Sequence, residues 1–191
     1  MKRLFSFLLI ALLSFSLLLG LASCTGAGNG ALKTTVSEAE WNAAFEASNV
    51  TASGYVTERD RQESLLMQIT SDAIFTENDG YTSLVIKKDG NWHSVREGVL
   101  SSQMNGVSAS ISFLMRSFRL PSYESFTYDE QTKSYRYVKS EGSSGFYQFD
   151  VYFENGVITK IEGREDIGEV THFFEFKDYG STVVEVPSGL R

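Results

Sequence analysis

The sequence has few of the residues that build disulfide and metal sites. Its 191 residues include one cysteine and two histidines. A single cysteine excludes a disulfide scaffold and a zinc site made of several cysteines, and two histidines leave little for a histidine-rich metal site. We therefore expect neither a metal nor another cofactor.

An excess of basic residues is also lacking. There are 17 basic against 24 acidic side chains, a formal net charge of -7, whereas a nucleic-acid-binding domain shows a basic footprint. Hydrophobic residues make up 42% and charged residues 21% of the chain, which is typical of globular proteins and excludes wholesale disorder. The composition predicts a folded domain that does not bind nucleic acid.

The longest apolar run lies at the N-terminus. Two basic residues precede 18 residues from Phe5 to Ala22, a length between the apolar region of a signal peptide and a membrane span. The run ends in Leu21-Ala22-Ser23-Cys24, which resembles the lipobox of bacterial lipoproteins. Such a motif needs small residues for access by the signal peptidase and a thiol that accepts the diacylglyceryl group. An uncleaved transmembrane anchor is the alternative.

The lipobox resemblance implies a signal peptide over residues 1–23 and lipidation at Cys24. A Gly-rich flexible tether would follow over residues 24–35, and a single domain over 36–191. Two or three acyl chains hold a protein stably on a membrane, whereas one does so only marginally. We therefore expect a protein anchored to the cell membrane on its extracytoplasmic side, with a mature net charge of -9.

Two segments show the pattern of short amphipathic helices. Ser37 and Glu40 have the spacing of a capping box, and apolar residues from Trp41 onward share one face, which predicts a helix over 37–48. A second apolar stripe predicts a helix over 107–119, which Pro121 stops.

The remaining domain is rich in strand signals. Alternating apolar and polar residues, separated by turns such as Asn78-Asp79-Gly80 and Glu154-Asn155-Gly156, indicate an antiparallel sheet. The predicted strands cover 65–70, 81–88, 92–95, 126–128, 135–138, 146–153, 157–162, 170–176 and 182–186. About ten strands and two helices predict an α+β domain.

The C-terminal third also resembles a known superfamily in its residue pattern. Residues 149–158 read as an aromatic strand and an Asn-Gly turn, residues 174–180 contain Phe-Lys-Asp-Tyr-Gly, and Pro187 closes the run. This order is similar to the half-barrel superfamily of lipoprotein carriers and lipid-binding lipoproteins (LolA/LppX-like). The resemblance implies a strongly curved antiparallel sheet, a half β-barrel, wrapped around helices and a largely apolar cavity. No binding residue of that family matches a position here.

Aromatic residues are abundant, and 22 of the 25 follow residue 23. They could fill a core and form cross-strand pairs, or they could line an apolar pocket that a curved sheet leaves open on its concave side. The residues expected to line such a pocket for a hydrophobic small molecule are Leu65, Met67, Ile69, Phe149, Phe153, His172, Phe174 and Phe176.

Catalytic chemistry has little support in the sequence. His172 is the only candidate for acid-base work, and a histidine that is hydrogen-bonded inside the core or at its rim is the preferred explanation. Glu162, Glu165, Asp166 and Glu169 cluster around an acidic connection over 163–168, but the order of a calcium-binding loop is absent. No nucleophile or nucleotide motif is present.

The sequence therefore predicts a non-catalytic, membrane-anchored lipoprotein that binds a hydrophobic ligand on the concave side of its sheet. The alternative is a protein-interaction or envelope-structural module that has a filled core and no small-molecule ligand. An enzyme that uses His172 is a third hypothesis.

Overall fold

The structure is a computed structural model that describes residues 35–116, 120–139, 146–165 and 170–190, and only the backbone of Phe146 and Tyr147. The chain divides into two compact units, residues 1–35 and 36–191, and the second is described here. Residues 1–34, which include Cys24, the predicted signal peptide and all but the last residue of the predicted tether, lie outside the described residues.

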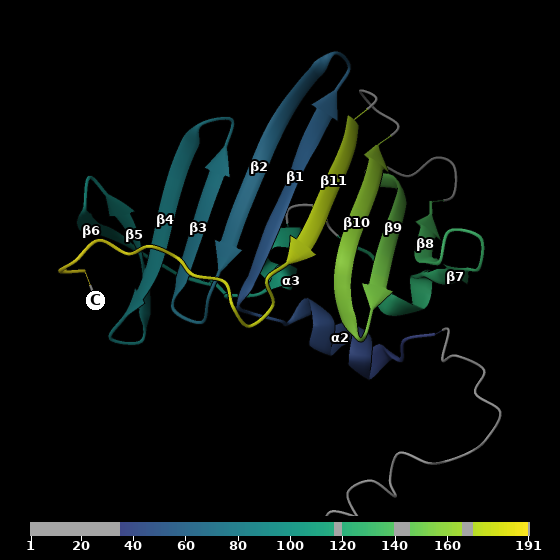
Figure 1. Cartoon of the computed structure of the whole chain (residues 1–191), viewed down its shortest axis with the longest axis horizontal. Coiled ribbons are helices and arrows are strands. Elements are labelled where there is room, and N and C mark those ends of the chain that lie inside the picture. Colours follow the sequence, from purple (N-terminus) through teal and green to yellow (C-terminus); the bar gives the residue numbers. More distant parts are fainter. Residues whose placement is uncertain (1–34, 117–119, 140–145, 166–169, 191) are drawn as a thin grey trace, which may run out of the picture. The chain divides into compact units, whose positions relative to one another are not determined.

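The described part of the chain is mostly a single antiparallel sheet (Figure 1). Its eleven strands are β1 Val50–Glu58, β2 Arg61–Ile69, β3 Ala73–Asn78, β4 Tyr81–Lys88, β5 Asn91–Arg96, β6 Val99–Met104, β7 Thr127–Asp129, β8 Ser134–Val138, β9 Phe146–Glu154, β10 Val157–Glu165 and β11 Val170–Lys177.

The sheet consists of two meanders that meet at its centre. Its strand order is β6-β5-β4-β3-β2-β1-β11-β10-β9-β8-β7, so the first strand pairs with the last. At this junction Ala52 lies opposite Phe176 and Gly54 lies opposite Phe174. The sheet does not close, because β6 and β7 are edges. The predicted α+β domain, with an antiparallel sheet on two short helices, is confirmed at this level.

Tight turns join consecutive strands where the sequence predicts them. Asp79-Gly80, Asp89-Gly90 and Asn155-Gly156 form two-residue loops, and all six residues have positive φ, for example 52° at Asn155 and 81° at Gly156. Two-residue hairpin loops with both φ angles positive match the twist of the flanking strands, which explains the Asn/Asp-Gly pairs.

The first predicted helix forms as α2, Glu38–Phe45, and the prediction of helix over 46–48 is wrong. The hydroxyl of Ser37 accepts a hydrogen bond from the Glu40 N–H, while the Glu40 carboxylate accepts one from the Ser37 N–H at 2.8 Å. This confirms the capping box. Trp41 and Phe45 are buried on the face that meets the sheet.

The second predicted helix is shorter than expected. The helix α3 covers only Ile111–Met115, and the prediction of helix over 107–110 is wrong. Ser110 has extended backbone angles and its hydroxyl accepts a hydrogen bond from the Phe113 N–H, so it caps the helix there. Residues 117–119 lie outside the described residues, and a short 3₁₀ turn, η2, follows at Tyr123–Ser125.

The predicted strand at 182–186 is wrong, although its alternation is real. Thr182 and Val184 are buried while Val183 is exposed, but the segment pairs with no strand. Both sides of β11 are already taken by β1 and β10, so the chain that follows has no sheet edge to join. It crosses the sheet instead (Figure 1), and Val184 and Leu190 pack with Ala73 and Ile86.

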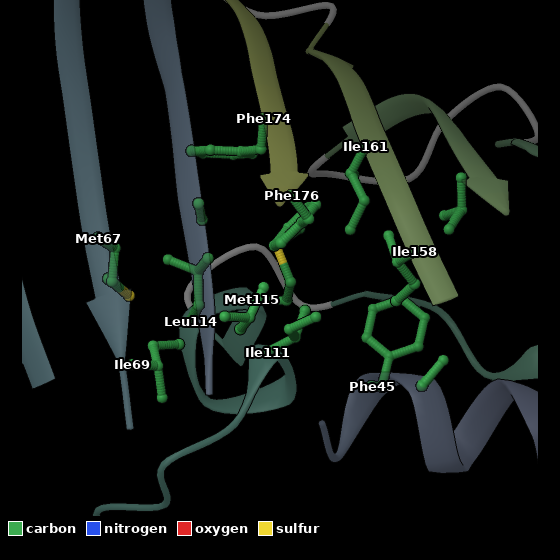
Figure 2. Close-up of a cluster of buried hydrophobic side chains, with 14 of the residues drawn as sticks. Phe45, Met67, Ile69, Ile111, Leu114, Met115, Ile158, Ile161, Phe174 and Phe176 are labelled. Carbon is green, nitrogen blue, oxygen red and sulfur yellow. The ribbon is translucent and has the colours of Figure 1, made fainter. Parts of the chain in front are cut away.

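The main core lies on the other face, between the sheet and the two helices (Figure 2). We call this face the helix face, and the one crossed by the C-terminal segment the opposite face. Helix-face strand residues such as Ile69, Ile158 and Phe176 belong to one buried cluster with Phe45 and Met115 of the helices.

Candidate functional site

The eight residues predicted to line a pocket do share one face of the sheet. The register of the central strands puts Met67 beside Ala52, and Ala52 beside Phe176, on the helix face. Alternation along β2, β9 and β11 places the other members on the same face. The structure therefore brings together residues that are about 110 positions apart in the sequence.

These residues lie in the packed core. Ile69 has none of its surface exposed, and Phe149 and Phe174 expose 1% each. A side chain that lines a water-sized void would keep accessible surface, so these three contact protein atoms instead. Leu65 and Phe153 are half-buried and pack against the same cluster. The two hollows described below are lined mainly by other residues.

His172 is buried on the helix face and faces one carboxylate. Its Nε2 lies 3.1 Å from Oε1 of Glu165. Burial lowers the pKa of His172 below its usual value, while the hydrogen bond and charge of Glu165 act in the opposite direction. This arrangement accounts for a histidine held in the core.

The acidic residues considered as metal ligands do not converge where they are described. β10 continues to Glu165, so the predicted connection over 163–168 begins later than expected. Glu162 accepts a hydrogen bond from the Tyr152 hydroxyl. Glu162 and Glu165 are three positions apart on β10, so the alternation of side chains along a strand places them on opposite faces of the sheet. Asp166 and Glu169 lie outside the described residues. Among the described residues no group of three or more acidic, histidine or cysteine side chains could hold a metal ion.

A hollow of about 720 Å³ opens beside the two helices and is our candidate site. Four residues of one α2 face, at positions 38, 41, 42 and 45, line it together with the C-cap residue Glu46, which is the spacing of a single helical stripe. The other described lining residues come from α3 and its C-cap, from the segment before η2 and from η2 itself: Ser112, Met115, Arg116, Leu120, Pro121, Ser122, Tyr123 and Glu124.

Aromatic packing fixes the floor of this hollow. The Trp41 ring has its centroid 5.1 Å from that of Phe45, 5.6 Å from Tyr123 and 4.8 Å from Phe126. The Tyr123 hydroxyl donates to the Val36 carbonyl at 2.7 Å. These contacts hold α2 and η2 in place, so the hollow is built on rigid parts of the domain.

Polar contacts join the two helices at the side of the hollow. The Ser112 hydroxyl donates to Oε1 of Glu46 at 2.6 Å, and the Ile111 N–H donates to the Ala47 carbonyl at 3.2 Å. Ser110 continues this chain of hydroxyls to Ser112 at 2.9 Å. The start of α3 is thereby fixed to the end of α2.

The rim of the hollow carries three exposed carboxylates, Glu38, Glu46 and Glu124. The backbone N–H of Glu124 and the hydroxyl of Ser122 lower the pKa of the Glu124 carboxyl, which keeps it ionised. Among the described lining residues the basic one is Arg116, whose Nη1 donates to the Gly106 carbonyl at 3.0 Å. An apolar floor and a mostly acidic rim can hold an amphipathic molecule.

A second hollow, of about 610 Å³, lies near the ends of β9, β10 and β11. Phe153 and Phe176 of the predicted pocket are among its lining residues, together with three lysines. Lys160 pairs with Glu162 at 3.1 Å and lies 3.8 Å from the Tyr152 ring centroid. Lys133 pairs with Glu130 at 2.7 Å. Most of its basic charge is therefore balanced within the protein.

No motif in the sequence singles out the residues of the first hollow as a site. Two apolar stripes in the sequence indicate buried helix faces, one with Trp41 and Phe45 and the other with Leu114 and Met115. Nothing in their spacing shows that the two helices and the segment around Pro121 leave a space between them. That space depends on tertiary packing.

The helices of the described residues are too short or too polar to span a bilayer. Comparison with known proteins adds no relative: no family model matches this chain, and no curated protein matches it.

Proposed function

We propose that this protein is an extracytoplasmic lipoprotein, anchored to the cell membrane through Cys24, whose folded domain binds a hydrophobic molecule without catalysis. The Leu21-Ala22-Ser23-Cys24 motif after an apolar run supports the anchor. The hollow of about 720 Å³ carries the binding part of the proposal, because small-molecule pockets measure about 300–1,000 Å³. We place the ligand there because the helix face of the sheet, where the sequence predicts the pocket, is occupied by core residues.

We further propose that the sheet is a half β-barrel of the LolA/LppX-like kind. Support comes from its antiparallel order and from the single face on which both helices pack. In this proposal the helices fill the concave side, and the ligand site has moved to the groove beside α2. The hollow is lined by carboxylates, hydroxyls, a guanidinium and apolar groups, and His172 is not among them, so we assign it no catalytic step.

The anchor is tested with Cys24→Ser in the full chain. We expect loss of acyl labelling, retention of the signal peptide and altered fractionation, because serine has no thiol to accept the diacylglyceryl group. Unchanged labelling and membrane fractionation would contradict the anchor. The residues described as lining the hollow all lie between positions 38 and 124, so the binding site has a test of its own.

The binding site is tested by native mass spectrometry of the full chain extracted from membranes. We expect a co-purifying apolar molecule, which Asn42→Trp should displace because Asn42 is exposed and lines the hollow. Ala43→Trp is the matched control: it places the same side chain on the next, exposed residue of α2, which does not line the hollow. An equal amount of bound molecule in both variants would remove the hollow as the site.

The filled core favours a second candidate function, a protein-interaction or envelope-structural module. Side chains such as Phe149 and Phe174 leave almost no accessible surface within the helix-face core. A stoichiometric protein partner that co-purifies with the chain, together with the absence of any bound small molecule, would favour this candidate over the first.

A further inference from the structure

We propose that the hollow beside α2 and α3 selects an organic cation that has an apolar portion. This inference rests on the proposed function, because it names the class of ligand that the same hollow takes. It is carried by the combination of an aromatic floor with a rim whose charges are mostly negative.

The negative charges come from three separate parts of the lining. Glu38 lies in the first turn of α2, Glu46 directly follows its last residue, and Glu124 lies in η2. Within the described part of the chain, none of these three carboxylates forms a salt bridge. Glu46 accepts a hydrogen bond from the neutral hydroxyl of Ser112, which leaves its charge in place. The rim therefore offers uncompensated negative charge to a ligand.

The positive charge of Arg116, the basic residue among the described lining residues, is directed to other groups. Arg116 donates from Nη1 to the carbonyl of Gly106, and its guanidinium carbon lies 5.2 Å from the ring centroid of Phe113. An anionic ligand would have to compete with these contacts and would also meet the three carboxylates. Among the described lining residues, three glutamates against one arginine give a formal charge of -2, which favours a cation.

The floor adds aromatic and aliphatic surface to this charge. Tyr123 is half-buried at the hollow, and Trp41 and Phe45 lie beneath it with Met115 and Leu120. Ring faces attract cations within about 6 Å, and quaternary ammonium groups are recognised in this way. Apolar atoms of the same ligand would bury against the half-buried side chains of Leu120 and Pro121. A molecule with both features matches the lining better than a neutral lipid does.

The size of the hollow favours a small molecule over a protein segment. The volume of about 720 Å³ is within the range of small-ligand pockets. A stable protein interface is instead a broad surface that buries about 800 Å² of each partner. The acidic charge of the whole chain also raises the local concentration of cations around the domain.

The test compares three water-soluble probes that share a hexyl chain: hexyltrimethylammonium, hexanol and hexanoate. Each is titrated by calorimetry into the full chain held in phosphatidylcholine nanodiscs, and titration into empty nanodiscs is subtracted. We expect hexyltrimethylammonium to bind about tenfold more tightly than hexanol, and hexanoate to bind most weakly. Affinity for the cation should fall as salt is added, because exposed charges are screened.

A charge-neutral variant separates attraction by the rim from general attraction to an acidic protein. The triple substitution Glu38→Gln, Glu46→Gln and Glu124→Gln should reduce the affinity for hexyltrimethylammonium about tenfold and leave hexanol unchanged. The control substitutes three exposed carboxylates outside the hollow, Glu58→Gln, Glu97→Gln and Glu185→Gln, and changes the net charge equally. It should retain most of the affinity.

The outcomes distinguish this inference from the function on which it rests. Equal binding of the cation and hexanol would overturn the charge selection and leave a hydrophobic site in place. Loss of affinity in the control as large as in the rim variant would also overturn it. Binding of none of the three probes would overturn both proposals. Unchanged affinity for hexanol shows that the rim variant is folded.

Discussion

At the scale of the single residue, Gly54 shows how closely the central strands approach each other. A Cβ atom at this position would lie 1.8 Å from the carbonyl oxygen of Phe173 and 3.0 Å from Cα of Phe174, both of which are backbone atoms. No side-chain movement can relieve such a contact, so β1 and β11 would have to separate. The glycine therefore allows the two meanders to join.

We predict that Gly54→Ala lowers the free energy of unfolding by about 2 to 3 kcal/mol, the upper part of the range for overpacking a core. Urea unfolding followed by tryptophan fluorescence measures this. Ser53→Ala, on the preceding residue and the opposite face, is the control and should cost less than about 1 kcal/mol. An equally small effect at both positions would show that the strands have room to move.

His172 predicts how stability depends on pH. Because burial lowers the pKa of His172 in the folded protein, the unfolded chain binds the proton more readily. The stability that neutral His172 contributes is therefore complete above the ordinary histidine pKa of about 6.5. It is lost as the pH falls toward the lowered pKa of His172 in the folded protein. The urea midpoint should decrease between pH 7.5 and pH 5.5.

The same titration in His172→Gln should show a smaller decrease, since glutamine can still contact Glu165 but does not titrate. His93→Gln removes the other histidine of the chain and should keep the decrease that His172 causes. A His172→Gln protein with the full decrease would assign the pH dependence to other groups.

At the scale of the element, the C-terminal segment stabilises the sheet without joining it. Val184 exposes 3% of its surface and packs with Ala73 and Ile86, whereas Val183 exposes 69%. Thr182 also contacts the centre of the sheet, where its hydroxyl lies 3.0 Å from that of Thr51. The segment thus covers apolar residues of β3 and β4 that the helices leave exposed on the opposite face.

We predict that Val184→Ala lowers the free energy of unfolding by about 2 kcal/mol, because it deletes buried methyl groups and leaves a cavity. Val183→Ala makes the identical change on the exposed side of the same segment and should alter stability by less than about 0.5 kcal/mol. Both are measured by urea unfolding. Similar values for the two valines would mean that the segment does not pack on the sheet in solution.

The elements differ in how far the sequence could predict them. β4 has the predicted bounds, because large apolar and polar residues alternate between two Asp-Gly turns. β1 was missed, since its helix-face positions hold small residues such as Ala52 and Gly54 where the sheet is most crowded. β6 was missed because an edge strand buries few apolar side chains. Helix periodicity failed before Ser110, where an N-cap overrode the apolar stripe.

The candidate site was predictable only in part. Alternation assigned Phe149, Phe174 and their neighbours correctly to a common face, yet a pattern of buried positions is the same whether that face is filled or hollow. The hollow beside α2 depends on the distance between two helices and on the path of the chain near Pro121. Such distances come from tertiary packing and leave no periodic signal in the sequence.

At the scale of the whole domain, one core joins the two meanders. Met67 and Ile69 of the first meander and Phe149 and Ile158 of the second belong to the same buried cluster, which also includes Trp41. The junction between β1 and β11 has eight paired positions. Neither meander can bury its helix-face residues without the other, because the helices cover both.

We therefore predict that the domain unfolds in a single cooperative transition. The two tryptophans report on different regions: Trp41 on the aromatic floor beside the second meander and Trp92 on β5 of the first. The variant Trp92→Phe retains only Trp41 as a fluorescent reporter, and Trp41→Phe retains only Trp92. In each variant the fluorescence should change at the same urea concentration as the circular dichroism, even if the two variants differ in stability. Coincident transitions by different probes are expected for two-state unfolding. If the fluorescence midpoint of Trp92 differed from the circular dichroism midpoint, the β3–β6 region would unfold on its own. The shared core would then not make unfolding cooperative across the whole sheet.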